Sequence, residues 1–155
     1  MEQDHVKILL TGATRWNQWR RENTETWPDL ERADLSGANL SSSNLANANL
    51  KYANLNRTNL SNADLSDAHL SRADLSGANL TEAKVIGANF DRASLISTNL
   101  QGANLLIASF MEANLNQADF RGANLSGANF SNAKVTEANF AGACLIRASF
   151  FKADL

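Results

Sequence analysis

The side chains that could carry out chemistry are few and lie far apart along the chain. His5, His69 and Cys144 are the only imidazoles and the only thiol among 155 residues, and 16 acidic against 14 basic residues give a net charge of −2. A nucleophilic site needs its nucleophile beside a base, and a zinc site needs Cys and His ligands at short spacings. Neither pattern occurs in the sequence, and a glycine-rich phosphate loop is also absent. The sequence therefore predicts a non-enzyme with no catalytic residue, no metal site and no cofactor.

Composition also limits the location and the partners that we expect. A single cysteine excludes an internal disulfide and, together with the acidic start at residues 1–4, predicts a cytoplasmic protein. No segment approaches the roughly 20 apolar residues that cross a bilayer, so we expect no membrane partner. A sequence pI near 5.6 supplies no overall basic field, so we expect no direct binding to nucleic acid.

The elements that must position these side chains follow a five-residue period. Every fifth residue from Leu30 to Leu155 is Leu, Phe or Val, and Ala occupies most of the positions two residues earlier. The residue between them is usually Asn or Asp, as in Ala38-Asn39-Leu40. A period of five fits neither the 3.6-residue helix nor the two-residue strand. A short, fixed period over so many residues indicates a solenoid.

The Ala-(Asn/Asp)-Leu-x-x motif resembles that of the pentapeptide-repeat family, and the resemblance covers residues 28–155. It implies an all-β solenoid, a right-handed quadrilateral β-helix with four units per coil and one unit on each face. The Leu or Phe of each unit and the Ala two residues before it would point inward. Twenty-six units would make about 6.5 coils, a rod about 31 Å long if neighbouring coils lie about 4.8 Å apart. Residues 20 apart would then stack on one face.

Residues 1–27 do not repeat, and we expect them to form a short α-helical cap over the first coil. The spacing of Trp16 and Trp19 predicts a helix, with Thr14 as its N-cap. Such a cap would cover the sheet edge at the open end of the solenoid. The Trp pair either packs in the core, which we favour, or forms a platform for a ligand. The segment from Trp16 to Arg20 resembles the helical caps of cyanobacterial members of the family.

The outward-facing columns are where a function would lie. Stacking by 20 aligns Ile86, Leu106, Ser126 and Ile146, and Ile107 adjoins this column. A contiguous apolar stripe can mark an interface, whereas scattered or partly shielded apolar residues are ordinary. Both interpretations stay open, and the candidate partner surface comprises Ile86, Leu106, Ile107 and Ile146.

A second outward column contains three guanidinium groups. It aligns Arg32, Tyr52, Arg72 and Arg92. Guanidinium groups in a row could contact phosphate or an acidic partner. Acidic neighbours such as Glu31 would neutralise much of that field, which is typical of a solvated face. The sequence does not decide whether this Arg column or the apolar stripe is functional.

The far end of the repeat is expected to be uncovered. The register continues to Leu155 without a cap, and Phe150 and Phe151 lie close to the end of the sequence. Because an uncovered apolar coil tends to pair with another surface, we expect a homodimer through the C-terminal coil, with Phe150, Phe151 and Leu155 as the candidate dimer end.

Two functions compete on these observations. The first is a protein-interaction scaffold with a partner that the sequence does not name. The alternative is a DNA-mimicking inhibitor or protector of DNA gyrase, the role of the best-understood proteins that the chain resembles. B-DNA carries one negative charge per roughly 1.7 Å of its axis, so a DNA-mimicking rod about 31 Å long would need about 18 negative charges. Residues 28–155 carry 12 acidic and 10 basic side chains. This balance favours the scaffold.

Overall fold

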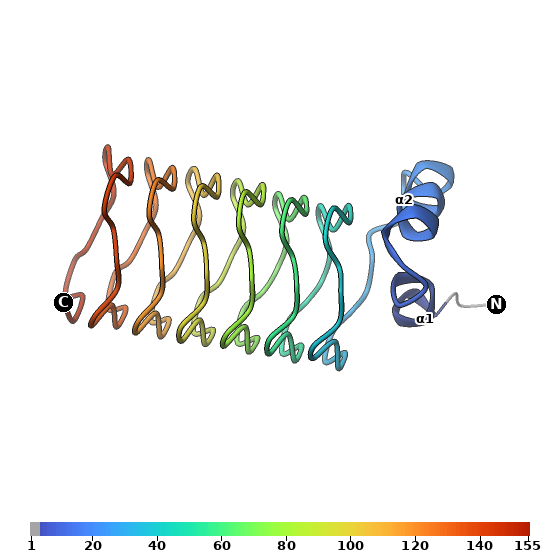
Figure 1. Ribbon diagram of the computed structural model, residues 1–155, viewed down its shortest axis with the longest axis horizontal. Helices are drawn as coiled ribbons and strands as arrows, with labels where there is room; N and C mark the ends of the chain where they lie inside the picture. Colours follow the sequence, from blue (N-terminus) through green and yellow to red (C-terminus); the bar gives the residue numbers. More distant parts are fainter. Residues whose placement is uncertain (1–3) are drawn as a thin grey trace.

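The computed structural model describes residues 4–155, which form a stack of four-sided coils with two helices at its N-terminal end (Figure 1). Helix α1 spans His5–Leu9 and helix α2 spans Ala13–Glu22. Residues 1–3 of the expected cap lie outside the described residues. From residue 28 onward, each five-residue unit repeats the same order: an inward small residue, an outward bridging residue, an inward large residue and a two-residue turn.

Each corner of a coil is a tight turn closed by a backbone hydrogen bond. The Ala33 N–H donates to the Leu30 carbonyl at 3.1 Å, and equivalent bonds recur along the stack. The second turn residue has a positive φ, as Arg32 does at 58°, which is the geometry of a type II turn. Among the described residues with positive φ, Ile107, at 54°, is the one β-branched side chain. Residues branched at Cβ rarely adopt this conformation, so the backbone at Ile107 is strained.

Neighbouring coils pair in parallel with a register of 20 residues. Asp29 bridges Asn49, and the same offset holds up to residue 154. The Leu30 N–H donates to the Asn49 carbonyl, and the Asn49 N–H donates to the Pro28 carbonyl, both at 2.8 Å. Each side of a coil contributes a single bridging residue, so the described chain has isolated bridges in place of longer strands. The prediction that residues 20 apart stack on one face is confirmed.

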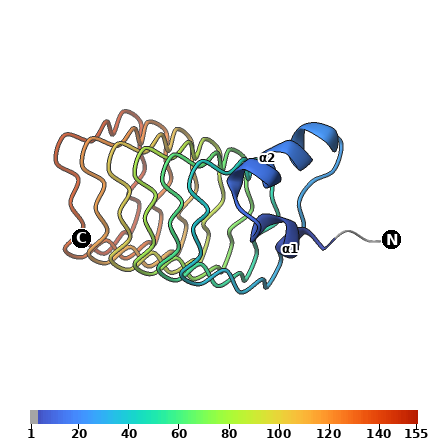
Figure 2. The same cartoon turned by 45° about the vertical axis from the view of Figure 1, so that its right-hand side comes forward.

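Figure 2 shows the backbone of the stacked coils in oblique view. Large inward residues are buried at the centre of this stack. Phe90, Phe110, Phe130 and Phe150 stack from coil to coil with ring centroids 5.0, 4.9 and 4.7 Å apart. Phe120 meets Phe110 from the opposite side, edge to face, at 6.0 Å. The two Phe ladders therefore occupy opposite sides of one core, as the spacing of ten residues predicts.

The bridging positions on one side of the stack form an amide ladder. The Asn59 Nδ2 donates to the Asn39 Oδ1 at 3.1 Å, and the same Asn39 oxygen accepts the Ser41 backbone N–H at 3.2 Å. These side chains thus tie two coils together and hold the following turn. Because these amides bond to one another and to the backbone, the side chains on this side of the stack have a structural role.

Side chains of α2 satisfy backbone groups at the exposed edge of the first coil. The Trp16 Nε1–H donates to the Asn44 carbonyl at 2.7 Å, and the Asn17 Oδ1 accepts the Asn44 N–H at 2.8 Å. The Arg20 guanidinium donates to the Ala46 carbonyl at 3.0 Å. Three side chains therefore take the place of a preceding coil, which is how α2 covers the sheet edge.

The start of α2 differs from the prediction. Its N-cap is Gly12, at φ 108°, and Thr14 lies inside the first turn. Gly12 allows the sharp reversal between α1 and α2, so the helix begins directly after it, and its carbonyl accepts the Trp16 N–H at 3.0 Å. Trp16 and Trp19 are buried and stack at 5.1 Å, so the pair belongs to the core and the ligand-platform alternative is wrong.

A buried hydroxyl offers a test of the inward positions. Ser43 occupies a position that Ala fills in most units, and its Oγ is buried with no hydrogen-bond partner among the described residues. Ser43→Ala should raise the free energy of unfolding by about 1 kcal/mol, measured by urea unfolding followed by circular dichroism. Thr58→Ala is the matched control, because the buried Thr58 Oγ1–H donates to the Leu35 carbonyl at 2.7 Å. Its loss should lower stability, and equal effects of the two changes would contradict the assignment.

Candidate functional site

The two histidines occupy unrelated places in the structure. The His5 Nδ1 accepts the Asp29 backbone N–H at 3.0 Å, and its ring lies 4.9 Å from the Trp19 ring. His5 therefore joins the cap to the first coil. His69 is exposed at an ordinary bridging position and pairs with Asn49 and Asn89 in the neighbouring coils. The structure brings neither imidazole close to the other or to the thiol.

Cys144 is a partly buried thiol at a bridging position. Its Sγ lies 3.2 Å from the Ser126 Oγ, and this hydrogen bond, helped by the Ile146 backbone N–H, lowers the pKa of the thiol. Within residues 4–155, no group of three or more His, Cys, Asp or Glu side chains could hold a metal ion. Neither helix in this part of the chain is long and apolar enough to span a bilayer.

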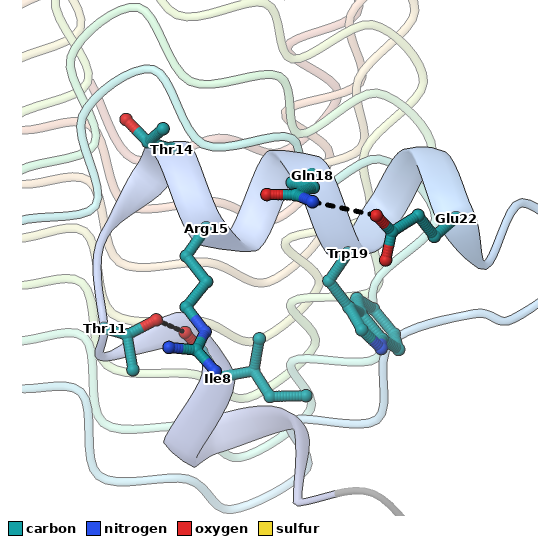
Figure 3. A pocket seen from close by; sticks show the side chains of 7 residues that line it. All are labelled: Ile8, Thr11, Thr14, Arg15, Gln18, Trp19 and Glu22. Atoms are coloured by element: carbon teal, nitrogen blue, oxygen red, sulfur yellow. Dashed lines mark hydrogen bonds between the residues drawn. The ribbon is translucent and has the colours of Figure 1, made fainter.

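A hollow of about 600 Å³ lies against the two cap helices (Figure 3). Arg15 extends from α2 toward Ile8, while Gln18 donates to Glu22 at 2.9 Å and the Thr11 hydroxyl donates to the Ile8 carbonyl at 2.6 Å. Binding sites for small molecules combine an apolar lining with a few convergent polar groups. Here Thr11, Gln18 and Glu22 already hold hydrogen bonds within the cap, so the hollow does not define a binding site.

The apolar outward residues gather around one side of the stack, which we call wall A. Its inward residues are Leu30, Leu50, Leu70, Phe90, Phe110, Phe130 and Phe150. The turns just before these residues along the chain, such as 106–107, form its preceding border, and the turns just after them, such as 111–112, form its following border.

The preceding border holds all four residues of the predicted partner surface. Ile107 and Ile146 are 61% and 67% exposed, whereas Ile86 and Leu106 are half-buried. Backbone hydrogen bonds stack the turns directly: the Ile107 N–H donates to the Ser126 carbonyl at 2.9 Å. The structure thus places the four apolar side chains along one edge of wall A.

The following border carries apolar residues that the sequence analysis did not assign to the same surface. Met111 and Phe151 are 37% and 64% exposed and lie on the coils of Phe110 and Phe150. Six of the ten large apolar residues that are exposed in the described chain border wall A: Trp27, Tyr52, Ile107, Met111, Ile146 and Phe151. The signal was present in the sequence, because residues 107 and 111 flank a single three-residue side.

The Arg column on the following border is not an open row of cations. The Tyr52 ring lies between the Arg32 and Arg72 guanidinium groups, at 5.4 and 5.6 Å. Arg92 donates to both carboxylate oxygens of Glu112, at 2.9 and 3.1 Å, and these bonds lower the pKa of Glu112. One guanidinium is therefore neutralised, which favours the solvated-face interpretation of this column.

Charge is distributed unevenly around the stack. Wall A and its borders carry six basic and five acidic residues, whereas the remainder of residues 28–155 carries four basic and seven acidic residues. Even the more acidic sides fall far short of the about 18 negative charges that a DNA-like rod of this length would display.

The last described coil is more open than the coils before it. Phe150 is partly buried and stacks on Phe130, while Leu155 is 82% exposed. Phe151 lies in the turn on the following border of wall A, outside this last core layer. Closure of the coil by a second copy stays a prediction.

These features define a β-solenoid built from five-residue units. A family model described as pentapeptide repeats matches residues 29–67, 73–105 and 113–150, with eight copies. The chain belongs to the pentapeptide repeat family, whose members form right-handed β-helices. A comparison with curated proteins gives no match.

Several solved structures are similar to the chain. HetL, a pentapeptide repeat protein involved in heterocyst differentiation regulation from the cyanobacterium Nostoc sp. strain PCC 7120, is 29% identical over 84% of this chain and 73% of HetL, with a TM-score of 0.47. Rfr23 from the cyanobacterium Cyanothece 51142 is 27% identical over 89% and 96%, with a TM-score of 0.31. Full-length QnrB1, a plasmid-mediated fluoroquinolone resistance protein, is 17% identical over 83% and 82%, with a TM-score of 0.47. With TM-scores below 0.5, these similarities carry no function over to this chain.

Proposed function

We propose that the chain is a non-enzymatic scaffold that binds a partner protein through wall A. Its contact residues are Ile86, Leu106, Ile107 and Ile146 on the preceding border. The observation that carries the proposal is Ile107, which is both strained at φ 54° and largely exposed.

Neither property of Ile107 benefits the isolated fold. A positive φ at a β-branched residue costs on the order of 1–3 kcal/mol, and a side chain that is mostly exposed recovers little of this through burial. Asn, Glu, Arg and Gly fill the same turn position elsewhere in the chain. Strain that the fold does not need is typical of binding sites, where the side chain is buried by the partner.

The charge of the rod supports the scaffold over DNA mimicry. A DNA mimic needs an acidic side and binds through long-range electrostatic attraction, which salt weakens steeply. Wall A and its borders carry six basic and five acidic residues, so the face is close to neutral, and six of the ten exposed large apolar residues of the described chain lie on these borders. Binding that depends on apolar burial should therefore persist at high salt.

Two variants on the preceding border test this proposal. Leu106→Asp places a charge in the contact, and we expect it to abolish capture of the partner from host lysate at both low and high salt. Ile107→Asn should weaken capture about tenfold, because roughly 1.5 kcal/mol of apolar burial is lost. The same change should raise the free energy of unfolding by about 1 kcal/mol through relief of the turn. Loss of binding together with a gain in stability would show that Ile107 contributes to the partner contact and not to folding.

Ile96→Asp is the matched control. Ile96 occupies the same first turn position as Leu106, is 37% exposed, and lies on a corner that does not border wall A. We expect it to leave capture unchanged. A partner retained by Leu106→Asp and Ile107→Asn would refute wall A as the contact, and gyrase subunits released only by salt would revive mimicry.

A further inference from the structure

The region of wall A between residues 106 and 152 is a strip with apolar side chains on both borders. We call these residues the apolar strip: Leu106, Ile107, Met111, Ile146 and Phe151. Between the borders lie small polar side chains: Ser109, Asn129 and Ser149. Leu106, Ile107 and Met111 belong to one coil, and Ile146 and Phe151 belong to the coil two further along. The coil between them has Ser126, Gly127, Ser131 and Asn132 on its borders.

Backbone hydrogen bonds in this strip run along the rod from coil to coil, and the coils of Phe110 and Phe130 have no free edge for a partner strand. The Ser109 N–H donates to the Ala88 carbonyl at 3.0 Å, and the Phe110 N–H donates to the Asn129 carbonyl at 2.8 Å. A strand laid on the strip would place its own amides against apolar side chains without partners, which is costly. The backbone groups of a helix are hydrogen-bonded within the helix, so a helical partner segment can bind the strip through side-chain contacts alone.

The dimensions of the strip suit a helix that lies along the rod. Three residues separate the two borders, about 10 Å of extended chain, and a helix with its side chains is about 10–12 Å across. The two apolar coils are two steps apart, about 9.6 Å, and seven residues of helix advance about 10.5 Å. Apolar residues at positions i and i+7 of one helix face would therefore meet both apolar coils, with i+3 or i+4 over the small residues between them.

Uncompensated charge lies at one end of the strip. Arg147 and Lys152 flank the coil of Phe150, and neither forms an ion pair with any residue in the range 4–155. The Lys152 ammonium lies 5.3 Å from the centre of the Phe151 ring. At the other end, Glu112 neutralises Arg92. The strip thus offers two cations where a helix C-terminus, with its negative dipole end, would be favoured.

Taking wall A as the binding face, which rests on the proposed function, we infer that it accepts an amphipathic α-helix of a partner protein. The helix lies along the rod with an i, i+3/i+4, i+7 apolar face on the apolar strip. Its C-terminal end lies over Arg147 and Lys152 and carries Asp or Glu in the last turn.

A displayed library of 18-residue peptides tests this inference directly. Half of its members carry a helical Ala/Glu/Lys frame with randomised faces and ends, and half carry central prolines that keep them extended. Selection on the intact chain should enrich helical members with apolar i and i+7 residues and carboxylates in the last turn. A proline placed mid-helix in a selected peptide should weaken its binding about a hundredfold.

Charge reversal and border variants complete the test. The double variant Arg147→Glu/Lys152→Glu keeps the fold, since Glu82 and Glu137 occupy the same turn position, and it should weaken acidic-ended peptides about tenfold and select basic-ended ones. Some selected peptides could be extended, or could lack carboxylates at their C-terminal end, and still lose binding on Ile107→Asn. That result would overturn the inference of a bound helix and leave wall A as the binding face. No binders, or binders that survive Ile107→Asn combined with Ile146→Asn, would overturn both the helix and the face.

Discussion

Phe110→Ala is expected to lower the free energy of unfolding by about 3–5 kcal/mol. The Phe110 ring is fully buried, stacks on Phe90 and Phe130 at 5.0 and 4.9 Å, and meets Phe120 edge to face. Truncation would leave a cavity in the middle of the ladder, and the neighbouring coils are held in register by backbone hydrogen bonds that limit collapse. Urea unfolding followed by far-ultraviolet circular dichroism measures the loss.

The control for this change is Phe151→Ala. Phe151 is 64% exposed in a turn, so its truncation should change stability by less than about 0.5 kcal/mol. If Phe110→Ala cost no more than Phe151→Ala, the inward assignment of the five-residue register would be wrong.

At the other end of the rod, Trp16→Ala should lower the free energy of unfolding by about 3–5 kcal/mol. The indole is fully buried, stacks on Trp19 and donates to the Asn44 carbonyl at 2.7 Å. Its removal deletes apolar packing and leaves an edge carbonyl of the first coil without its donor. Hydrogen exchange should then report faster exchange of the amides of the first coil, because the cap is detached.

Two variants separate packing from the hydrogen bond. Trp16→Phe keeps a ring but loses the donor, so we expect a smaller loss of about 1–2 kcal/mol. Trp27→Ala should change stability by less than about 0.5 kcal/mol, because the Trp27 side chain is exposed. Unchanged exchange of first-coil amides in Trp16→Ala would show that α2 does not protect the sheet edge.

The repeat made the coil predictable. Because each unit uses the same turn and the same inward positions, the five-residue period alone fixes which residues stack, and it sorts Phe110 and Phe120 to opposite sides. The period also brings Glu112 over Arg92, a pair that follows from the offset of 20 residues.

The cap could not be derived in the same way. Asn17 and His5 satisfy edge groups of the first coil, but no spacing rule links them to Asn44 or Asp29. The N-cap was misplaced at Thr14 because the reversal at Gly12 depends on how α1 packs. The offset of 20 residues groups side chains along one column, so it does not place Met111 beside Ile107 across the side that their two columns border.

The central claim is that wall A is the face that binds a partner, and site-specific photo-crosslinking tests it most directly. A photoreactive phenylalanine derivative would replace Ile107, Met111 or Ile96 in turn, and crosslinking would be carried out in host cells. We predict one common adduct from Ile107 and Met111, on the two borders of wall A, and none from Ile96. Adducts from Ile96 alone, or equal yields from all three positions, would contradict a dedicated face.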